Sequence, residues 1–397
     1  MDAKTIETPM RDANTRAINE THANARAVSV DEAQAQGLNE WLPQDLSPAV
    51  DIIKRATPDG FERNGTTHAT TEDYYGIPLL KRPLWRWEIA FYFFFEGISA
   101  GAFLISSMAD LFGKKRFRAI SRAGYYISFL TLLPCPPLLV ADLGRPERFH
   151  HMLRVWKPSS PMNLGAWALT GYSVPVMINA ARQLTGDLFP QHETLKRASR
   201  LLPAPLVAAS GIPFALTMTS YPGVLLSTTS TPVWTKSRFL GALFACSSIS
   251  TGLAAVTLAL AAHGDDNERA IKRLEKAENI SSLCEGATLA AYLLTSGVTA
   301  EPLTSGKYAG QFWIGAVGAG LVVPAAMRLA SSKRRKQSRA SSVVSSLLTL
   351  AGGLALKWAV VHAGRSSAED IAATHDATKP SASAPGWNAE STNANVH

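Results

Sequence analysis

Long runs of uncharged, mostly apolar residues recur along the middle of the chain, separated by short segments rich in Lys and Arg. A helix needs about 20 residues to cross the hydrocarbon core of a bilayer, and each run reaches that length. A soluble all-α domain is the alternative, but very apolar buried helices rarely recur in such a pattern. We therefore predict an all-α integral membrane bundle of about eight transmembrane helices. The predicted spans are residues 88–112, 122–141, 161–181, 202–222, 239–262, 280–299, 309–329 and 341–363.

Two polar tails flank this apolar core. Residues 1–80 carry 7 basic and 13 acidic residues, and residues 366–397 carry 1 basic and 4 acidic residues. Neither tail has enough apolar residues to offset the entropy lost on ordering, so both are predicted to be disordered. The first tail also lacks the basic start and apolar stretch of a secretory signal, which leaves membrane targeting to the first span. The transmembrane domain is accordingly predicted at residues 81–365.

The distribution of Lys and Arg predicts how the bundle is oriented. The loops after the first, third, fifth and seventh spans hold 19 basic residues, of which Arg328 to Arg339 form the last group. The segments on the opposite side hold 11 basic residues. Because basic loops tend to stay in the cytoplasm, both termini and the connection 142–160 are predicted to lie on the opposite side of the membrane.

The residues present argue against several kinds of redox and hydrolytic site. Cys135, Cys246 and Cys284 stand singly, so a disulfide scaffold, a Cys-ligated zinc site and an iron–sulfur cluster held by this chain alone are excluded. Haem within a membrane usually needs His ligands at that depth. None of the nine His lies in the middle of a predicted span, and no Walker, HExxH or GxSxG motif occurs. The sequence predicts no haem, iron–sulfur cluster or other metal site on this chain.

Ionisable residues within the predicted spans are the first candidates for function. Glu96 lies in the first span, Glu285 in the sixth and Lys357 in the eighth, and charges at such positions are costly unless they are paired or face a hydrated cavity. One interpretation is a proton-handling or ligand-binding pair of Glu96 and Lys357, with Glu285 and Asp110 extending a proton relay inward. The other is a structural interhelical ion pair or a Lys that snorkels to the surface. Asp110, beside Lys114, is interpreted as an ordinary helix-end ion pair.

A predicted helix break supplies the second candidate region. The second span ends in a proline-rich run that contains Pro134, Pro136 and Pro137, and such breaks at membrane depth are tolerated where they face protein or a cavity. The break leads directly to Asp142 and then to the charged segment 145–148. This loop could hold a polar headgroup or bind a partner, although a loop of this kind is usually only a structural lock.

Three stretches of the chain combine aromatic, glycine and charged residues, and the second is the most specific because a long match of mixed polar and apolar residues is improbable by chance. They are YYGIPLLKRPLWRWE with YFFFEGISAG (within residues 74–101), PPLLVADLGRPERF with MLRVWKPSSPM (within 136–162), and YPGVLLS with PVW and LGALF (within 221–244). These stretches resemble the NrfD/PsrC family, the integral-membrane subunits of bacterial oxidoreductase complexes of the polysulfide-reductase type. The eight-helix pattern extends the resemblance to about residue 365.

The resemblance implies a membrane anchor in the bacterial inner membrane that exchanges electrons with the quinone pool. The quinone would be menaquinone or ubiquinone. The electrons would pass to or from a separate iron–sulfur subunit, which in turn serves a molybdopterin-type catalytic subunit. Because that catalytic subunit selects the terminal substrate, polysulfide, tetrathionate, formate and nitrite systems are all compatible with such an anchor.

The resemblance also implies roles for particular residues. Asp142 corresponds by motif to the acidic residue that follows the second helix in the family, so it is predicted to hydrogen bond a quinone oxygen or take its proton. Arg145 and Arg148 are predicted to orient Asp142 or to dock the partner. Tyr92 and Trp87, near the outer end of the first span, are further candidates for the pocket.

One departure and two alternatives stay open at this point. Glu96 stands where the family often has Gly, so its role is predicted from its chemistry, as a catalytic proton-handling group, and not by simple transfer. A secondary transporter or ion-conducting protein would also explain intramembrane charges and a broken helix, but no inverted repeat relates residues 81–220 to 221–365. A structural anchor that binds the partner without touching quinone is the other alternative.

Overall fold

The structure is a computed structural model of the whole chain. It describes residues 80, 83–113, 117–189, 191–193, 197, 201, 203–262, 268–332 and 339–368. Most of both predicted tails lies outside these residues, so their predicted disorder stays a prediction. The last helix ends at Ser367, which means that the first two residues of the predicted C-terminal tail are helical.

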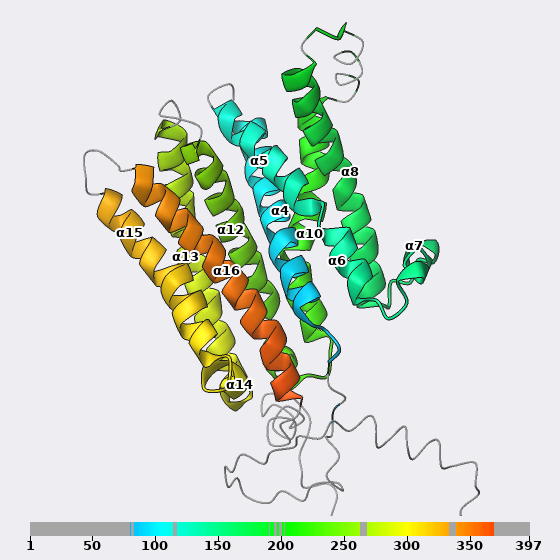
Figure 1. Cartoon of the computed structure of the whole chain (residues 1–397), viewed down its shortest axis with the longest axis vertical. Helices are drawn as coiled ribbons and strands as arrows, with labels where there is room; N and C mark the ends of the chain where they lie inside the picture. Colours follow the sequence, from blue (N-terminus) through cyan, green and yellow to red (C-terminus); the bar gives the residue numbers. More distant parts are fainter. Residues whose placement is uncertain are drawn as a thin grey trace, which may run out of the picture. The chain divides into compact units, whose positions relative to one another are not determined.

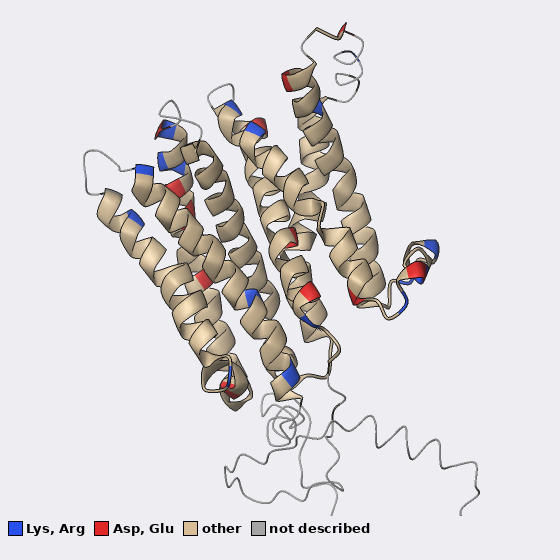
Figure 2. Cartoon of the chain, in the orientation of Figure 1, with Lys and Arg blue, Asp and Glu red and all other residues tan. Residues whose placement is uncertain are grey.

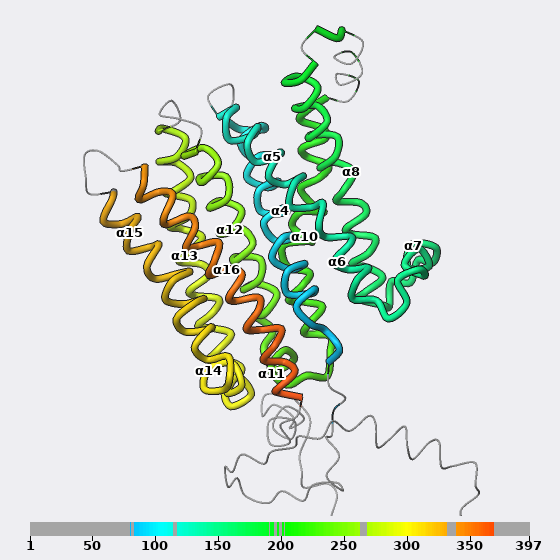
Figure 3. Tube along the Cα trace, viewed as in Figure 1, coloured from blue at the N-terminus to red at the C-terminus, as the bar shows by residue number. Residues whose placement is uncertain are grey.

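Every regular element in the described ranges is helical, as predicted. The long helices are α4 (Trp87–Phe112), α5 (Arg118–Leu132), α8 (Pro161–Leu188), α10 (Ala204–Ser227), α12 (Leu240–Ala262), α13 (Glu268–Ser296) and α16 (Arg339–Ser367). A π-helical segment, η7 (Gln311–Val322), continues into α15 (Val323–Ser332). The short elements are α6 (Cys135–Asp142), η4 (Pro146–Arg148), α7 (His151–Arg154), α11 (Pro232–Thr235), η6 (Gly297–Ala300) and α14 (Glu301–Thr304). Figures 1 and 3 show the long helices side by side, with successive ones running in opposite directions.

Five segments are long and apolar enough to cross a membrane: Trp87–Phe112, Arg118–Asp142, Leu240–Ala262, Gln311–Ser331 and Arg339–Ser367. The predicted count of eight is not confirmed by this criterion. The other three predicted spans fall on α8, α10 and α13, which have 28, 24 and 29 residues and pack into the same bundle. These three helices do not meet the combined criterion of length and apolarity, and the first turns of α13 carry several charged residues.

The alternating direction brings the ends of α4, α8, α12 and α15 and the starts of α5, α10, α13 and α16 to one end of the bundle, here called the basic-loop end (Figure 1). The opposite end carries the start of α4, the connection after α6 and the end of α16 (Figure 1). Most of each long helix is free of charged residues, and the few internal charges stand out in Figure 2. The structure thus reproduces the two predicted sets of loops, without testing which set is cytoplasmic.

Helix α4 lies at the centre of the bundle, where it packs against α5, α10, α12 and α16. Small residues permit the closest of these approaches. A Cβ atom at Gly252 of α12 would lie 2.6 Å from the backbone nitrogen of Ala102 in α4, and a Cβ at Gly101 would overlap the carbonyl oxygen of Ser248. Without a hydrophobic driving force between helices in lipid, such close backbone packing is a main source of cohesion.

The predicted break in the second span is present. Helix α5 ends at Leu132 and α6 begins at Cys135, with Pro134 as the residue before it and two further prolines in its first turn. Proline lacks the backbone N–H that would continue the hydrogen-bond ladder, so the chain turns here. The short α6 that follows packs against α4 and carries the chain to Asp142.

Candidate functional site

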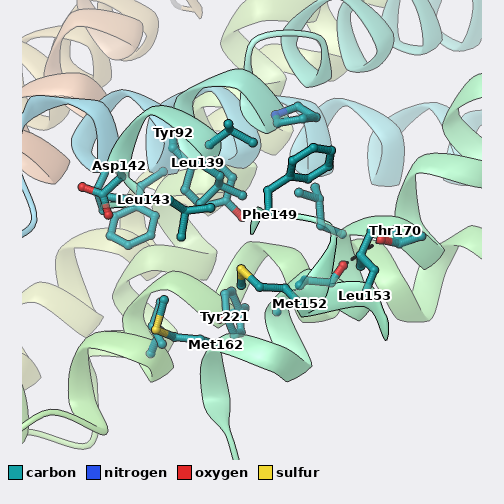
Figure 4. A pocket seen from close by; sticks show the side chains of 18 of the residues that line it. Tyr92, Leu139, Asp142, Leu143, Phe149, Met152, Leu153, Met162, Thr170 and Tyr221 are labelled. Carbon is teal, nitrogen blue, oxygen red and sulfur yellow. Dashed lines mark hydrogen bonds between the residues drawn. The ribbon is translucent and has the colours of Figure 1, made fainter. Parts of the chain in front are cut away.

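A cavity of about 330 Å³ opens beside α6, at the end of the bundle opposite the basic loops. Its walls come from the first half of α4, from α6, from the connection that contains α7, and from α8 and α10. Ligand pockets typically have volumes of roughly 300–1,000 Å³ and mostly apolar walls with a few polar groups. This cavity has that character, because Leu, Ile, Val, Phe and Met side chains surround one carboxylate, that of Asp142 (Figure 4).

The helix break places Asp142 at the cavity. Because α6 is separate from α5, its last residues turn toward α4, and Leu139, Val140 and Asp142 all line the cavity. The Asp142 side chain is half-buried, and the charged groups that act on it electrostatically are Glu88 and Arg86, within and just before the start of α4. A carboxylate is thus held at the rim of an apolar space.

The connection after α6 closes one side of the cavity with Phe149, Met152 and Leu153. Its path is fixed by Asn163 in the first turn of α8. The Asn163 amide nitrogen Nδ2 donates to the carbonyl oxygens of Met152 at 2.7 Å and Val155 at 2.9 Å. The sequence reasoning did not identify Asn163, whose position three residues after Ser160, the N-cap of α8, is the local signal that marks it.

Two tyrosines from different helices meet at the cavity. Tyr92 of α4 is 3% exposed, and Tyr221 of α10 donates a hydrogen bond from its hydroxyl to the carbonyl oxygen of Pro161 at 2.9 Å. The Tyr221 ring packs on Gly165 of α8 because no side chain stands there. Figure 4 shows Tyr221 beside Met152 and Met162 and Tyr92 beside Leu139. Tyr221 belongs to the third family-like stretch, but the sequence reasoning assigned it no role.

The structure separates the residues predicted for the pocket. Asp142 and Tyr92 line the cavity together. Trp87 does not; its side chain is 50% exposed and lines a second, open apolar groove with Phe91, Phe95 and residues of α6. Arg145 and Arg148 are exposed and are not among the cavity-lining residues. Among the described residues, no hydrogen bond or ion pair joins either arginine to Asp142.

The predicted intramembrane charges come together behind the cavity. Glu96 and Lys357 are both fully buried, and they interact electrostatically with each other. Within the described part of the chain, neither carboxylate oxygen of Glu96 has a hydrogen-bond partner. The Lys357 ammonium donates to Ser247 Oγ at 2.9 Å, and Glu285 is a second acidic group that acts on it. These three predicted residues therefore form one group, whose role in proton movement stays a prediction.

The sequence reasoning missed one buried ion pair. It groups Arg328 with the basic loop, but the side chain is 2% exposed and Nη1 lies 3.0 Å from Oε2 of Glu278, whose side chain is 1% exposed. The predicted sixth span begins at residue 280, whereas α13 begins at Glu268, so Glu278 lies well inside a helix that packs against α12 and α15. Hydropathy cannot reveal that Arg328 has a buried partner, because the pairing of Arg328 with Glu278 depends on how α15 packs against α13.

Among the described residues, no group of three or more His, Cys, Asp or Glu is arranged to hold a metal ion. The described helices include some long and apolar enough to span a membrane, and they enclose an apolar cavity with one carboxylate. These features define the class of this protein as an integral membrane protein with an internal cavity.

Comparisons with known proteins place the chain within that class. The family described as "Polysulphide reductase, NrfD" matches residues 78–367, and the protein belongs to this family of oxidoreductase membrane subunits. It is 29% identical over 309 residues to one of the chains of the polysulfide reductase of Wolinella succinogenes, a match that covers 71% of the present chain and 94% of the relative. It is 24% identical to protein NrfD of Escherichia coli, over 71% of the present chain and 95% of that protein. A shorter match, 34% identical over 24% of the present chain and 22% of the relative, is to one of the subunits of the selenate reductase of Mesobacillus selenatarsenatis.

Proposed function

We propose that this chain is the quinone-reactive subunit of a respiratory oxidoreductase complex in the bacterial inner membrane. Its partners would be an iron–sulfur subunit and a molybdopterin-type catalytic subunit. The observation that carries the proposal is the cavity itself, in which Asp142 and Tyr92 line one apolar space. The terminal substrate would be set by the catalytic subunit, and the names of the relatives favour a sulfur- or selenium-containing oxyanion or polysulfide.

The cavity walls suit the head group of a menaquinone or ubiquinone. Aliphatic and aromatic side chains would bury the ring, and the polar groups at the rim would bind its oxygens. A bound quinone supplies a couple of two electrons and two protons. In that site, the Asp142 carboxylate would accept a proton from a quinol hydroxyl, or return one in the opposite direction. Tyr221, whose hydroxyl is hydrogen-bonded to the carbonyl oxygen of Pro161, would form part of the wall against which the quinone ring packs.

The surface beside the cavity suits a docking partner. Arg145 and Arg148 are exposed on the connection after α6, and Val155 and Trp156 on the same connection are 58% and 59% exposed. Charged groups that surround exposed aromatic residues are typical of protein interfaces. An iron–sulfur subunit bound here would bring its cluster near the cavity, on the periplasmic side if the basic loops are cytoplasmic.

The test of this proposal is quinol turnover by the purified complex that carries Asp142→Asn. The substitution keeps the side-chain shape and removes the proton acceptor, so turnover is expected to fall about 100-fold or more while quinone still co-purifies with the chain. Glu301→Gln is the matched control, because Glu301 is an exposed carboxylate of α14, outside the cavity. Its turnover should equal that of the unmodified complex.

Two results would point away from this function. Normal turnover in Asp142→Asn would remove Asp142 from the mechanism and favour an anchor that does not touch quinone. A chain that purifies without quinone or an iron–sulfur protein, and that takes up an ion when reconstituted alone, would favour the secondary transporter. Neither result depends on knowing the terminal substrate.

A further inference from the structure

A file of buried and partly buried ionisable and hydroxyl side chains leads away from the cavity toward the basic-loop end. It begins on α4, where Tyr92 and Glu96 are four residues apart and therefore lie on one face of the helix. Tyr92 lines the cavity, and Glu96 interacts electrostatically with Tyr92 and with Tyr221. Glu96 is fully buried and its oxygens have no hydrogen-bond partner in the described structure.

Lys357 of α16 is the next group in the file. Its Cε atom comes close to α4 at Gly97, where a Cβ would lie 3.5 Å away. Its ammonium is bonded to Ser247 of α12 and lies 5.6 Å from the centre of the Phe244 ring. That ring packs edge-on against Phe93, which lines the cavity. Lys357 is therefore separated from the cavity by only two aromatic rings, those of Phe244 and Phe93. It also lies beside α4 at Gly97, the residue that follows Glu96.

The file continues between α12 and α13. Glu285 of α13 acts electrostatically on Lys357 and faces Ser247 and Ser250 of α12. The Ser250 and Ser281 hydroxyl oxygens are 2.8 Å apart and form a hydrogen bond between α12 and α13. Hydroxyl groups of this kind, together with water, can pass a proton between the carboxyl and amine groups.

The Glu278–Arg328 ion pair comes next, and both of its members are hydrogen-bonded to further side chains. Thr257 of α12 donates to Glu278 Oε1 at 2.6 Å. The Arg328 guanidinium donates to Asn279 at 3.0 Å and to Ser282 at 2.7 Å. One further turn toward the basic-loop end, Ser342 of α16 donates to Glu275 Oε1 at 2.7 Å. Glu275 is only seven residues from the start of α13.

We propose that these residues form a proton route between the quinone cavity and the basic-loop end, with the Glu278–Arg328 pair as its gate. The proposal rests on the proposed function. In quinol oxidation, the quinol loses two electrons to the iron–sulfur partner and two protons, and the protons leave through Glu96, Lys357 and Glu285. In quinone reduction, two electrons arrive from the partner and two protons arrive by the same residues. Electron transfer in this complex would then move charge across the membrane.

A purely structural role accounts for only part of this arrangement. A buried ion pair between helices can offset its desolvation cost when each charge is matched and further hydrogen-bonded, as Glu278 and Arg328 are. Glu96 is not matched in this way, because Lys357 is bonded to Ser247 and no described group bonds the Glu96 carboxyl. Keeping an acid without a hydrogen-bond partner and a nearby amine at membrane depth is costly, and a proton route would use both groups.

The side of proton release tests the route in the unmodified complex. The complex is reconstituted into sealed liposomes that contain a pH-sensitive dye, with a naphthoquinol as donor and ferricyanide, which cannot cross the membrane, as acceptor outside. Ferricyanide selects complexes whose partner subunit faces outward, so their basic-loop end faces inward. Oxidation of one quinol reduces two ferricyanide ions and releases two protons. Acidification of the interior is expected, and acidification of the exterior alone would overturn the route while leaving quinol oxidation intact.

Variants then test the individual residues. Lys357→Met and Glu278→Gln are each expected to lower interior acidification and turnover about tenfold or more, with unchanged binding of a quinone-site inhibitor. Glu278→Asp retains a carboxylate and should recover a large part of both. Lys272→Met is the control, because Lys272 is an exposed lysine of α13 paired with Glu268. Normal proton release in both Lys357→Met and Glu278→Gln would overturn the proposal. An unmodified complex that neither binds nor oxidises quinol would contradict the proposed function instead.

Discussion

The ring of Tyr221 packs directly on the Cα atom of Gly165, so that a Cβ atom at residue 165 would lie 2.5 Å from the Tyr221 Cε1 atom. This contact joins α10 to α8 at the wall of the cavity. The hydroxyl of the same tyrosine is bonded to Pro161 one turn earlier, so the ring cannot move without losing that hydrogen bond. The shape of the cavity therefore depends on the absence of a side chain at residue 165.

Gly165→Ala should alter quinone binding more than it alters folding. The added methyl group must displace the Tyr221 ring, and misplacing a group at a site by about 1 Å is enough to lower activity strongly. We expect the KM for quinol to rise about tenfold or more. The measurement is steady-state quinol oxidation by the purified complex, with the bound quinone quantified after extraction.

Gly186→Ala is the control for that substitution. Gly186 lies on the same helix, α8, and no neighbouring atom comes within 4 Å of the position that its Cβ would occupy. The two variants should therefore have similar amounts of folded protein but different KM values. Equal KM values would show that Tyr221 does not shape the binding site.

Gly101→Ala should destabilise the bundle itself. The new Cβ would overlap the Ser248 carbonyl of α12, and a backbone group cannot move aside as a flexible side chain can. The expected cost is about 1–3 kcal/mol, the usual cost of overpacking, which exceeds the helix propensity gained with Ala. Thermal unfolding of the detergent-purified chain gives the measurement.

The matched comparison for Gly101→Ala is Gly310→Ala, since no atom lies within 4 Å of the Cβ position at Gly310. That variant should unfold at the same temperature as the unmodified chain or slightly above it. If both variants unfolded alike, the close approach of α4 and α12 would have no energetic importance.

The orientation predicted from the basic loops is open to chemical labelling. A cysteine replacing Gly144, which is exposed after α6, should react in intact cells with a maleimide that crosses only the outer membrane. A cysteine replacing Lys272, which is exposed near the start of α13, should react only after the inner membrane is permeabilised. Loss of the Lys272 ion pair should cost little, because surface pairs contribute about 0–1 kcal/mol.

The unmodified chain provides the background for labelling, since Cys135 is buried, Cys246 is partly buried and Cys284 is exposed on the surface of a helix within the bundle. The reverse pattern, with Lys272→Cys accessible in intact cells, would invert the topology. It would also move the proposed partner surface to the cytoplasm.

Much of the fold followed from the sequence because its signals are local. Apolar runs of membrane-spanning length predicted the helical bundle, and the prolines around residue 136 predicted the break between α5 and α6. The same local reasoning underestimated α13, whose charged first turns interrupt the apolar pattern although they remain helical. It also placed Arg328 in a loop, because an apolar pattern does not reveal which charges find buried partners.

The sequence by itself determined the class of protein and the two sets of loops. It also marked Asp142 as a candidate residue of the binding site. Hydropathy and a long motif are properties of consecutive residues, and they need no knowledge of how helices pack. Only the tertiary structure decided that Tyr92 faces the cavity while Trp87 faces the second groove, and that Tyr221 joins the site from a distant part of the chain. It also brought Glu96, Lys357 and Glu285 together from three helices. These relationships depend on helix rotation and close packing, which are fixed by contacts between residues far apart in the sequence.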